Sequence, residues 1–181
     1  MEHIEKLAED IAASGIKHVF GIPGSGPSLT LIDYLEKLNV EFCLTHFEGT
    51  APIIAGTIAK LNGSTGIAIS IKGPGLANMV PGLTSCFFES MPVVAISEAY
   101  APDTPYFKAH KRLDHKKLTY SVVKESRFLS DIGSDFKTLA DLAQAEIPGP
   151  VHLDVSSPSV KNDSPANSQD PLPPQTFNET K

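Results

Sequence analysis

Residues 45–51 read Thr45-His46-Phe47-Glu48-Gly49-Thr50-Ala51 and join an apolar strand, residues 40–44, to a helix of small residues expected over 48–61. Glu48 is then in the first turn of a helix, where the helix dipole favours an ionised carboxylate. It also lies just beyond the carboxyl end of a strand, where open α/β sheets bind ligands. First-turn acids are common in ordinary helices too, where they contribute about 0.3 kcal/mol or a little more. The stretch alone leaves both interpretations open.

Helical and strand patterns alternate along the chain. From Ile4 to Ile11 apolar residues recur at helical spacing, and Gly15 is a typical residue to end that helix. Further helices are predicted over 28–38, 48–61, 76–88 and 133–145. Strands are predicted over 18–22, 40–44, 66–71, 93–96 and 151–155. The middle three lack polar alternation, as expected when helices cover both faces of a sheet. Such alternation predicts right-handed crossovers and an α/β fold, a three-layer α/β/α sandwich with a mostly parallel sheet.

Composition indicates one domain with room for a tail, since the chain has 181 residues of which 41% are apolar. The net charge of −6 argues against nucleic-acid binding, which needs clustered Lys and Arg. Cys43 and Cys86 lie in apolar surroundings and are interpreted as buried hydrophobic residues in a reducing compartment, with no metal site expected. The sequence shows neither a signal segment nor the roughly 20 apolar residues of a membrane helix. We therefore expect a cytoplasmic protein without a membrane partner.

Two glycine-rich turns and one basic cluster invite other interpretations. Residues 24–29 have the first two glycines of a dinucleotide fingerprint, but Leu29 stands in place of the third. Residues 72–75, Lys-Gly-Pro-Gly, place lysine before the glycines, unlike a phosphate-binding loop. These turns either let backbone approach a ligand closely or are simply tight connections. For the basic cluster, residues 108–117, a solvated loop is favoured over an anionic-substrate site.

Five motifs occur in an order that resembles a known family: Val19-Phe20-Gly21-Ile22-Pro23-Gly24, the Glu48 stretch, Gly73-Pro74-Gly75, Ala77-Asn78 and Glu89-Ser90-Met91-Pro92-Val93. The chain resembles the N-terminal pyrimidine-binding domain of thiamine-diphosphate enzymes of the acetolactate synthase and 2-oxoacid decarboxylase type. The resemblance covers roughly residues 1–158. It implies the thiamine-diphosphate-binding fold and a 2-oxoacid substrate, while the choice between decarboxylation and carboligation stays open.

The resemblance implies a catalytic role for Glu48. In this family a glutamate hydrogen-bonds the N1′ atom of the cofactor's aminopyrimidine ring, and their shared proton helps to generate the ylide at C2. The cofactor supplies the organic chemistry, and the protein supplies orientation and proton management. The spacing from Glu48 to the later motifs has no gap. Phe47 then stands where many members have histidine, with His46 one position earlier.

Other candidate site residues follow from the same resemblance. The cofactor-binding candidates are Pro23, Gly24, Gly73, Pro74, Gly75 and Asn78. For Asn78, capping and turn bonding explain the residue equally well. The weaker substrate candidates are Ser25, Lys72, His110 and His115. Lys72 is interpreted as a contact for a substrate carboxylate or as a partner salt bridge.

The family holds the diphosphate and Mg²⁺ with a Gly-Asp-Gly motif, which these 181 residues do not contain. A hard cation needs such oxygen ligands. We therefore expect Mg²⁺ only through a partner domain, and a thiamine diphosphate site shared in a homo-oligomer or with a Gly-Asp-Gly-containing subunit. A truncated or excised enzyme domain, and a non-catalytic dimerisation or regulatory module, are the alternatives.

The last part of the chain changes composition. Residues 159–181 are rich in Ser, Pro, Asn and Asp and poor in large apolar side chains, so they are predicted to be a disordered tail or linker. Residues 1–158 form the predicted domain. The resemblance leaves open whether FAD binds, because that site lies mostly in the central domain of the family.

Overall fold

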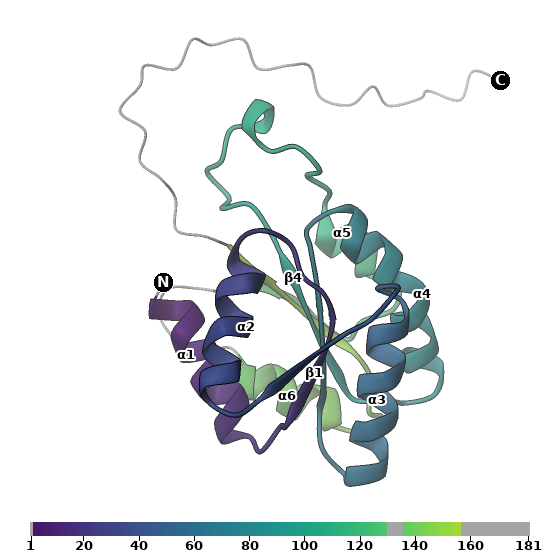
Figure 1. The fold of residues 1–181 in the computed structure, drawn as a ribbon. Helices are drawn as coiled ribbons and strands as arrows, with labels where there is room; N and C mark the ends of the chain where they lie inside the picture. The colour runs from purple at the N-terminus through teal and green to yellow at the C-terminus, as the bar shows by residue number, and fades with distance from the viewer. Residues whose placement is uncertain (1, 130–135, 157–181) are drawn as a thin grey trace, which may run out of the picture.

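The computed structural model describes residues 2–129 and 136–156, which form a parallel sheet between two layers of helices (Figure 1). The six strands lie in the order β2-β1-β3-β4-β6-β5, and each neighbouring pair is parallel. Their bounds are β1 His18–Ile22, β2 Glu41–Leu44, β3 Gly66–Ser70, β4 Val93–Glu98, β5 Ser126–Phe128 and β6 Val151–Val155. The predicted three-layer α/β/α sandwich is confirmed.

Helices cover both faces of the sheet. Their bounds are α1 Glu2–Ala13, α2 Pro27–Lys37, α3 Thr50–Asn62, α4 Pro74–Phe88, α5 His115–Thr119 and α6 Phe136–Gln144, with a short 3-10 helix η1 at Tyr106–Lys108. Figure 1 shows α1, α2 and α6 on one side and α3, α4 and α5 on the other. No helix in the described part of the chain is long and apolar enough to cross a membrane.

Each helical layer packs its own hydrophobic core against the sheet. Leu7, Leu35 and Leu139 belong to the core under α1, α2 and α6, and Ala55 and Leu83 to the core under α3 and α4. Strands β3 and β4 are buried at every residue, so the apolar runs with which they begin have the predicted cause. The prediction fails for β2, whose residues are exposed or half-buried because it is an edge strand.

The sequence analysis does not predict three short elements, β5, η1 and α5. Strand β5 has only three residues, which are Ser, Arg and Phe, and carries no apolar run. The basic cluster, interpreted as a loop, contains the end of η1 and the start of α5, whose N-cap is the Asp114 side chain accepting from the Lys117 amide at 3.0 Å. The predicted helix 133–145 begins outside the described residues, as do the domain boundary at 158 and the tail 159–181.

Helices α3 and α4 approach closely because a glycine separates them. A Cβ atom on Gly82 would lie 2.0 Å from the carbonyl oxygen of Gly49 and 2.6 Å from the Pro52 ring. Both of those residues belong to the start of α3, where Gly49 is the N-cap. Gly82 therefore sets the distance between α4 and the turn that carries Glu48.

We predict that Gly82→Ala destabilises the protein by about 1–2 kcal/mol. Alanine gains up to about 1 kcal/mol of helix propensity, but overpacking costs typically 1–3 kcal/mol and outweighs it. Chemical denaturation of the 181-residue protein measures the difference. Gly149→Ala is the control, because its Cβ would meet only ordinary contacts at 3.5 Å from Lys124. Equal stability of the Gly82 variant and the wild type would contradict the close packing.

Candidate functional site

Glu48 lies in the turn between β2 and α3. The amide of Ala51 donates to the Glu48 carbonyl at 3.2 Å, and the Thr45 hydroxyl donates to the Phe47 carbonyl at 3.1 Å. Because Gly49 is the N-cap and α3 begins at Thr50, the predicted place of Glu48 in the first helical turn is wrong by two residues. Its place beyond the carboxyl end of a strand is as predicted.

Asn78 contacts Glu48 directly. The Asn78 amide donates to Glu48 Oε2 at 3.1 Å, across a separation of 30 residues. The Asn78 side chain is exposed on the second turn of α4, and Glu48 is half-buried. The structure thus brings together two candidate residues from separate motifs. The uncharged amide of Asn78 holds one carboxylate oxygen of Glu48 in place.

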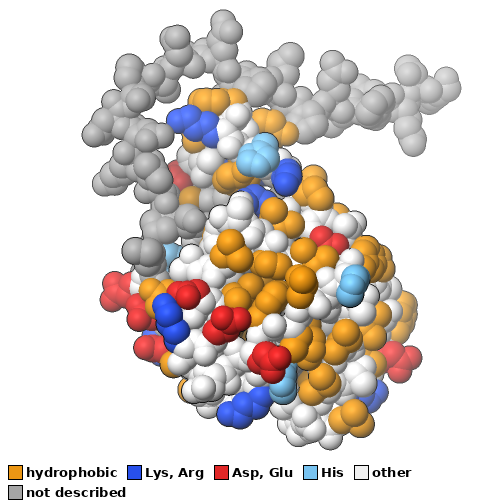
Figure 2. Space-filling view, viewed as in Figure 1, with side chains coloured by type: hydrophobic (Ala, Val, Ile, Leu, Met, Phe, Trp, Pro, Cys, Tyr) orange, Lys and Arg blue, Asp and Glu red, His pale blue; other side chains and the backbone are white. Residues whose placement is uncertain are grey.

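Large apolar side chains of β2, α3, the turn between them and α4 face solvent. Leu44 is 69% exposed, Phe47 46% and Ile53 40%, while Phe88, at the far end of α4, is 77% exposed. Figure 2 shows hydrophobic side chains gathered over the part of the surface where α3 and α4 lie. Contiguous exposed apolar surface often marks a site where another protein or domain binds.

The turn after β1 encloses an internal carboxylate, that of Glu98 at the end of β4. Glu98 Oε1 accepts from the Gly26 amide at 3.1 Å, the Ser28 amide at 3.3 Å and the Ser28 hydroxyl at 2.6 Å. A Cβ atom on Gly24 would lie 2.5 Å from the Glu98 carboxyl carbon. The close approach expected of this turn therefore serves a side chain of the same protein. Pro23 is half-buried and Ser25 is exposed beside it.

Lys72 completes the environment of Glu98. Its ammonium group lies 2.7 Å from Glu98 Oε2, with the Lys72 side chain 14% exposed and that of Glu98 fully buried. Burial by itself would raise the pKa of Glu98, but the hydrogen bond and charge of Lys72, together with Ser28 and Gly26, hold that pKa below its ordinary value. Lys72 is thus engaged within its own chain, whereas the sequence suggested a substrate or a partner.

The turn Gly73-Pro74-Gly75 begins α4 and needs its glycines. Gly73 has a φ of +62°, and a Cβ there would lie 2.0 Å from the Lys111 carbonyl oxygen. A Cβ on Gly75 would lie 2.6 Å from the Ile71 side chain. Pro74 has no N–H, which is tolerated in the first turn of a helix. The Gly73 amide donates to His115 Nε2 at 3.0 Å.

The two candidate histidines have separate surroundings. His110 is exposed, and its Nδ1 lies 2.9 Å from the Tyr100 hydroxyl. His115 is buried, and its Nδ1 lies 2.6 Å from Asp154 Oδ1. The structure therefore does not pair the two histidines with each other.

Sequence reasoning assigned no role to the groups around His115. Ser97 Oγ lies 3.0 Å from Asp154 Oδ1 and 2.6 Å from His152 Nε2, and Ser126 Oγ lies 2.8 Å from His152 Nδ1. Polar side chains in otherwise apolar strands, such as His152 and Asp154 in β6, are the signal that could have identified them. Glu98, the last residue of β4, carries the same signal.

His115, His152 and Asp154 also have the composition of a metal site, since one ligand atom from each lies within 4.8 Å of the others. The hydrogen bonds oppose that use. A neutral histidine that binds metal through Nδ1 carries its proton on Nε2. Here Nε2 of His115 faces the N–H of Gly73 at 3.0 Å, so two donors would confront each other. The donor set fits a hydrogen-bonded network better than a metal centre.

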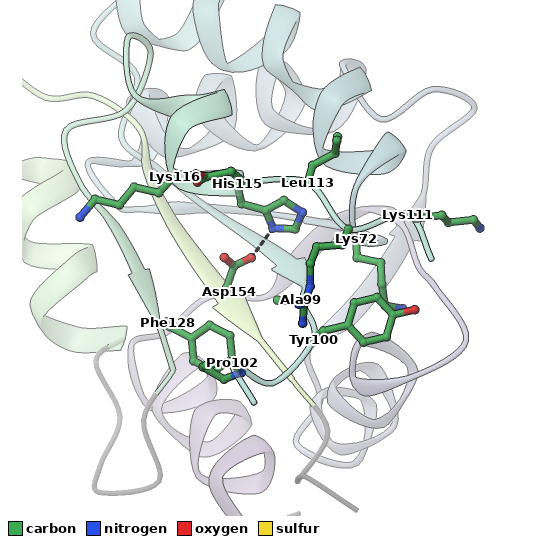
Figure 3. A pocket seen from close by; sticks show the side chains of 12 residues that line it. Lys72, Ala99, Tyr100, Pro102, Lys111, Leu113, His115, Lys116, Phe128 and Asp154 are labelled. Carbon is green, nitrogen blue, oxygen red and sulfur yellow. Dashed lines mark hydrogen bonds and ion pairs between the residues drawn. The ribbon is translucent and has the colours of Figure 1, made fainter. Parts of the chain in front are cut away.

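A pocket of about 250 Å³ lies beside this network. Figure 3 shows His115 and Asp154 joined at its inner wall, with Lys72 beside the ring of Tyr100. Lys111 and Lys116 extend outward from opposite sides of the pocket (Figure 3). Arg112 stacks on Tyr100 at 5.7 Å and donates to the Ala101 carbonyl at 3.3 Å.

His152 makes stability depend on pH. Complete burial lowers the pKa of His152 to about 4, and the Asp154 carboxylate opposes the shift only in part. Between pH 6.5 and 4 the unfolded chain binds a proton at this residue that the native protein does not. We therefore predict that acidification across this window removes about 3 kcal/mol of stability.

Denaturation at several pH values checks this prediction, together with an NMR titration of the His152 ring. Glu98 adds its own loss only below its ordinary value of 4.5, because its pKa is lowered in the folded state. A native His152 ring that titrates near pH 6.5 would contradict the prediction.

Comparison with known proteins gives one family. The profile of the thiamine pyrophosphate enzyme, N-terminal TPP binding domain, matches residues 1–117. The acetolactate synthase large subunit of Buchnera aphidicola subsp. Acyrthosiphon pisum is 29% identical over 164 residues, 88% of this chain and 28% of that protein. Acetolactate synthase isozyme 2 large subunit of Escherichia coli is 31% identical over 158 residues, 86% of this chain and 29% of that protein.

An archaeal relative gives the same result. The probable acetolactate synthase large subunit of Methanocaldococcus jannaschii is 28% identical over 158 residues, 86% of this chain and 27% of that protein. The chain thus spans a little over a quarter of the length of these curated relatives. The parallel sheet and the family match agree: the chain belongs to the family of N-terminal TPP-binding domains of thiamine pyrophosphate enzymes.

Proposed function

We propose that this chain supplies the half of a thiamine diphosphate site that holds the aminopyrimidine ring, with Glu48 as the cofactor-activating acid. The observation that carries the proposal is the position of Glu48. It follows an edge strand at the carboxyl end of the sheet, is half-buried and accepts a hydrogen bond from Asn78 at 3.1 Å. Its other carboxylate oxygen would face a ring nitrogen of the cofactor.

The surroundings of Glu48 fit an aromatic ring. Phe47, the residue before Glu48, is exposed. An apolar side chain at this place would cover a flat heterocycle and exclude water from the proton that it shares with Glu48. When bound, thiamine diphosphate supplies the carbon that attacks the carbonyl of a 2-oxoacid. Glu48 would hold and exchange a proton with the pyrimidine nitrogen, and Asn78 would keep the carboxylate aimed at it.

The rest of the site is proposed to come from elsewhere. The 181 residues hold no Gly-Asp-Gly motif, so the diphosphate and Mg²⁺ would bind a domain in another chain or in residues outside this sequence. The exposed apolar side chains around α3 and α4 suit contact with that domain, in a homo-oligomer or with a separate subunit. The resulting enzyme would decarboxylate or carboligate 2-oxoacids, as the acetolactate synthase names of the relatives suggest.

A non-catalytic dimerisation or regulatory module is the competing function, because the same apolar surface suits self-association. The contact between Glu48 and Asn78 favours catalysis, since dimerisation alone does not require an oriented carboxylate. A complex that assembles but does not bind the cofactor would support the module instead.

We predict that the 181-residue chain does not bind thiamine diphosphate tightly by itself. The apolar surface beside Glu48 covers only the ring, and the diphosphate would remain in water. Calorimetry with Mg²⁺ and the cofactor on the purified chain tests this expectation. Micromolar binding, equivalent to about −8 kcal/mol, would show that no further domain is needed.

In the complex with a Gly-Asp-Gly-containing partner, Glu48→Gln is expected to slow hydrogen–deuterium exchange at C2 of the bound cofactor by about a hundredfold to ten-thousandfold. Glutamine keeps the size of the side chain but cannot exchange a proton with the ring nitrogen. NMR of the cofactor measures the exchange, at saturating cofactor so that weaker binding does not enter.

Glu36→Gln is the matched control, since Glu36 is exposed near the end of α2 and lies outside the proposed site. Unchanged C2 exchange in the Glu48 variant would overturn the assignment of Glu48. A loss equal in both variants would indicate a general effect of lost charge.

A further inference from the structure

A row of polar side chains crosses the sheet beneath α4 and α5, where an apolar core would be expected. Ser97 of β4 is in register with Asp154 of β6, and His152 of β6 is in register with Ser126 of β5. Ser97 and His152 are fully buried, and His115 of α5 covers them with 6% exposure. Burying so many polar groups is costly unless every one is hydrogen-bonded.

One set of donors and acceptors satisfies the hydrogen bonds in this row. An ionised Asp154 only accepts, so Ser97 must donate to it at 3.0 Å. The Ser97 hydroxyl has one proton, so His152 Nε2 must donate to Ser97 at 2.6 Å. His152 is neutral, because burial keeps its pKa near 4, so its Nδ1 is bare and accepts from Ser126 at 2.8 Å.

The row ends at the first residue of the Gly-Pro-Gly turn. The Gly73 amide can only donate, so His115 Nε2 must be the acceptor at 3.0 Å, and the ring proton must be on Nδ1, which faces Asp154 at 2.6 Å. The opposite tautomer would set two donors against each other at Gly73 and would remove the hydrogen bond from His115 to Asp154, leaving Asp154 with Ser97 as a donor. Gly73 itself has a φ of +62° and lies against the Lys111 carbonyl, so few alternative positions are open to it.

We propose that this row is a positioning device for the turn Gly73-Pro74-Gly75. Asp154, oriented by Ser97, His152 and Ser126, holds the proton of His115 on Nδ1, and the bare Nε2 then anchors the amide of Gly73. His115 is a positioning residue in this arrangement, not a catalytic one. The device acts on the backbone of the turn whether or not a cofactor binds nearby.

Two substitutions of His115 test the roles of its two ring nitrogens separately. In His115→Asn the side-chain amide reaches about as far as Nδ1, so it keeps the donor to Asp154 but loses the acceptor for Gly73. In His115→Gln the amide oxygen reaches about as far as Nε2, so it keeps the acceptor for Gly73 but loses the link to Asp154. The two variants bury similar polar groups and differ by one methylene.

The primary measurement is amide hydrogen exchange at Gly73 in the 181-residue protein. We expect exchange to be about tenfold faster in His115→Asn than in the wild type, as loss of one hydrogen bond predicts, and close to wild type in His115→Gln. A merely structural role for His115 would lower the stability of both variants and would not separate their Gly73 exchange rates. Equal Gly73 exchange in the two variants would overturn the proposal.

A second measurement needs no variant of His115. Nitrogen-15 NMR of the wild-type protein at neutral pH is expected to show the proton of His115 on Nδ1 and a bare Nε2. In Asp154→Asn the acceptor charge is lost, so the Nε2–H tautomer gains population and Gly73 exchange becomes faster. A wild-type His115 with its proton on Nε2 would refute the proposal even if every variant failed to fold.

Discussion

The carboxylate of Glu98 joins the ends of three neighbouring strands at the carboxyl edge of the sheet. It belongs to β4, accepts hydrogen bonds from the turn after β1 and pairs with Lys72 after β3. The Glu98 side chain is fully buried and that of Lys72 nearly so, which means that loss of either partner would leave an uncompensated charge in the core. Breaking such a buried pair is strongly destabilising in other proteins. Glu98 therefore contacts the turn after β1 directly and the residue before the Gly-Pro-Gly turn through Lys72.

The same carboxylate explains why the turn after β1 is similar to an anion-binding loop. Gly24 has no room for a side chain because Glu98 fills the space, and Ser28 links the Gly24 amide to the carboxylate by accepting from one and donating to the other. A helix N-terminus with free amides is a common anion site. Here the anion comes from the protein itself, 72 residues along the chain from Gly26, and a single sequence gives no sign of that pairing.

Much of the fold could be predicted from local patterns. Strands β1 and β6 have the bounds that their apolar runs predicted, and both layers of helices follow from the periodicity. The failures have local causes too. Strand β5 is held by pairing with β6 and not by its own composition, and β2 is apolar in sequence but lies at the edge of the sheet. The sequence of β5 does not show that it pairs with β6, and the sequence of β2 does not show that it lies at the edge of the sheet.

The sequence predicts individual residues of the candidate site but not the contacts between them. Glu48 and Asn78 were selected from separate motifs, and the structure joins them. The sequence also points to Lys72, but not to its pairing with Glu98, because a polar residue at the end of an apolar strand can be noticed without showing which residue it contacts. His110 and His115 were selected together, yet one is exposed beside Tyr100 and the other is buried against Asp154. Tertiary contacts decided each of these cases.

The first two turns of α4 connect the two ends of the site. Gly73, at the N-cap, is anchored by His115, and Asn78, five residues later, holds Glu48. An α-helix rises 1.5 Å per residue, so these anchors are about 7.5 Å apart on one rigid element. A shift of the Gly-Pro-Gly turn would therefore move the Asn78 amide relative to Glu48. If thiamine diphosphate binds at Glu48 as we propose, its orientation depends on a helix whose start is anchored by a buried row of polar side chains through His115.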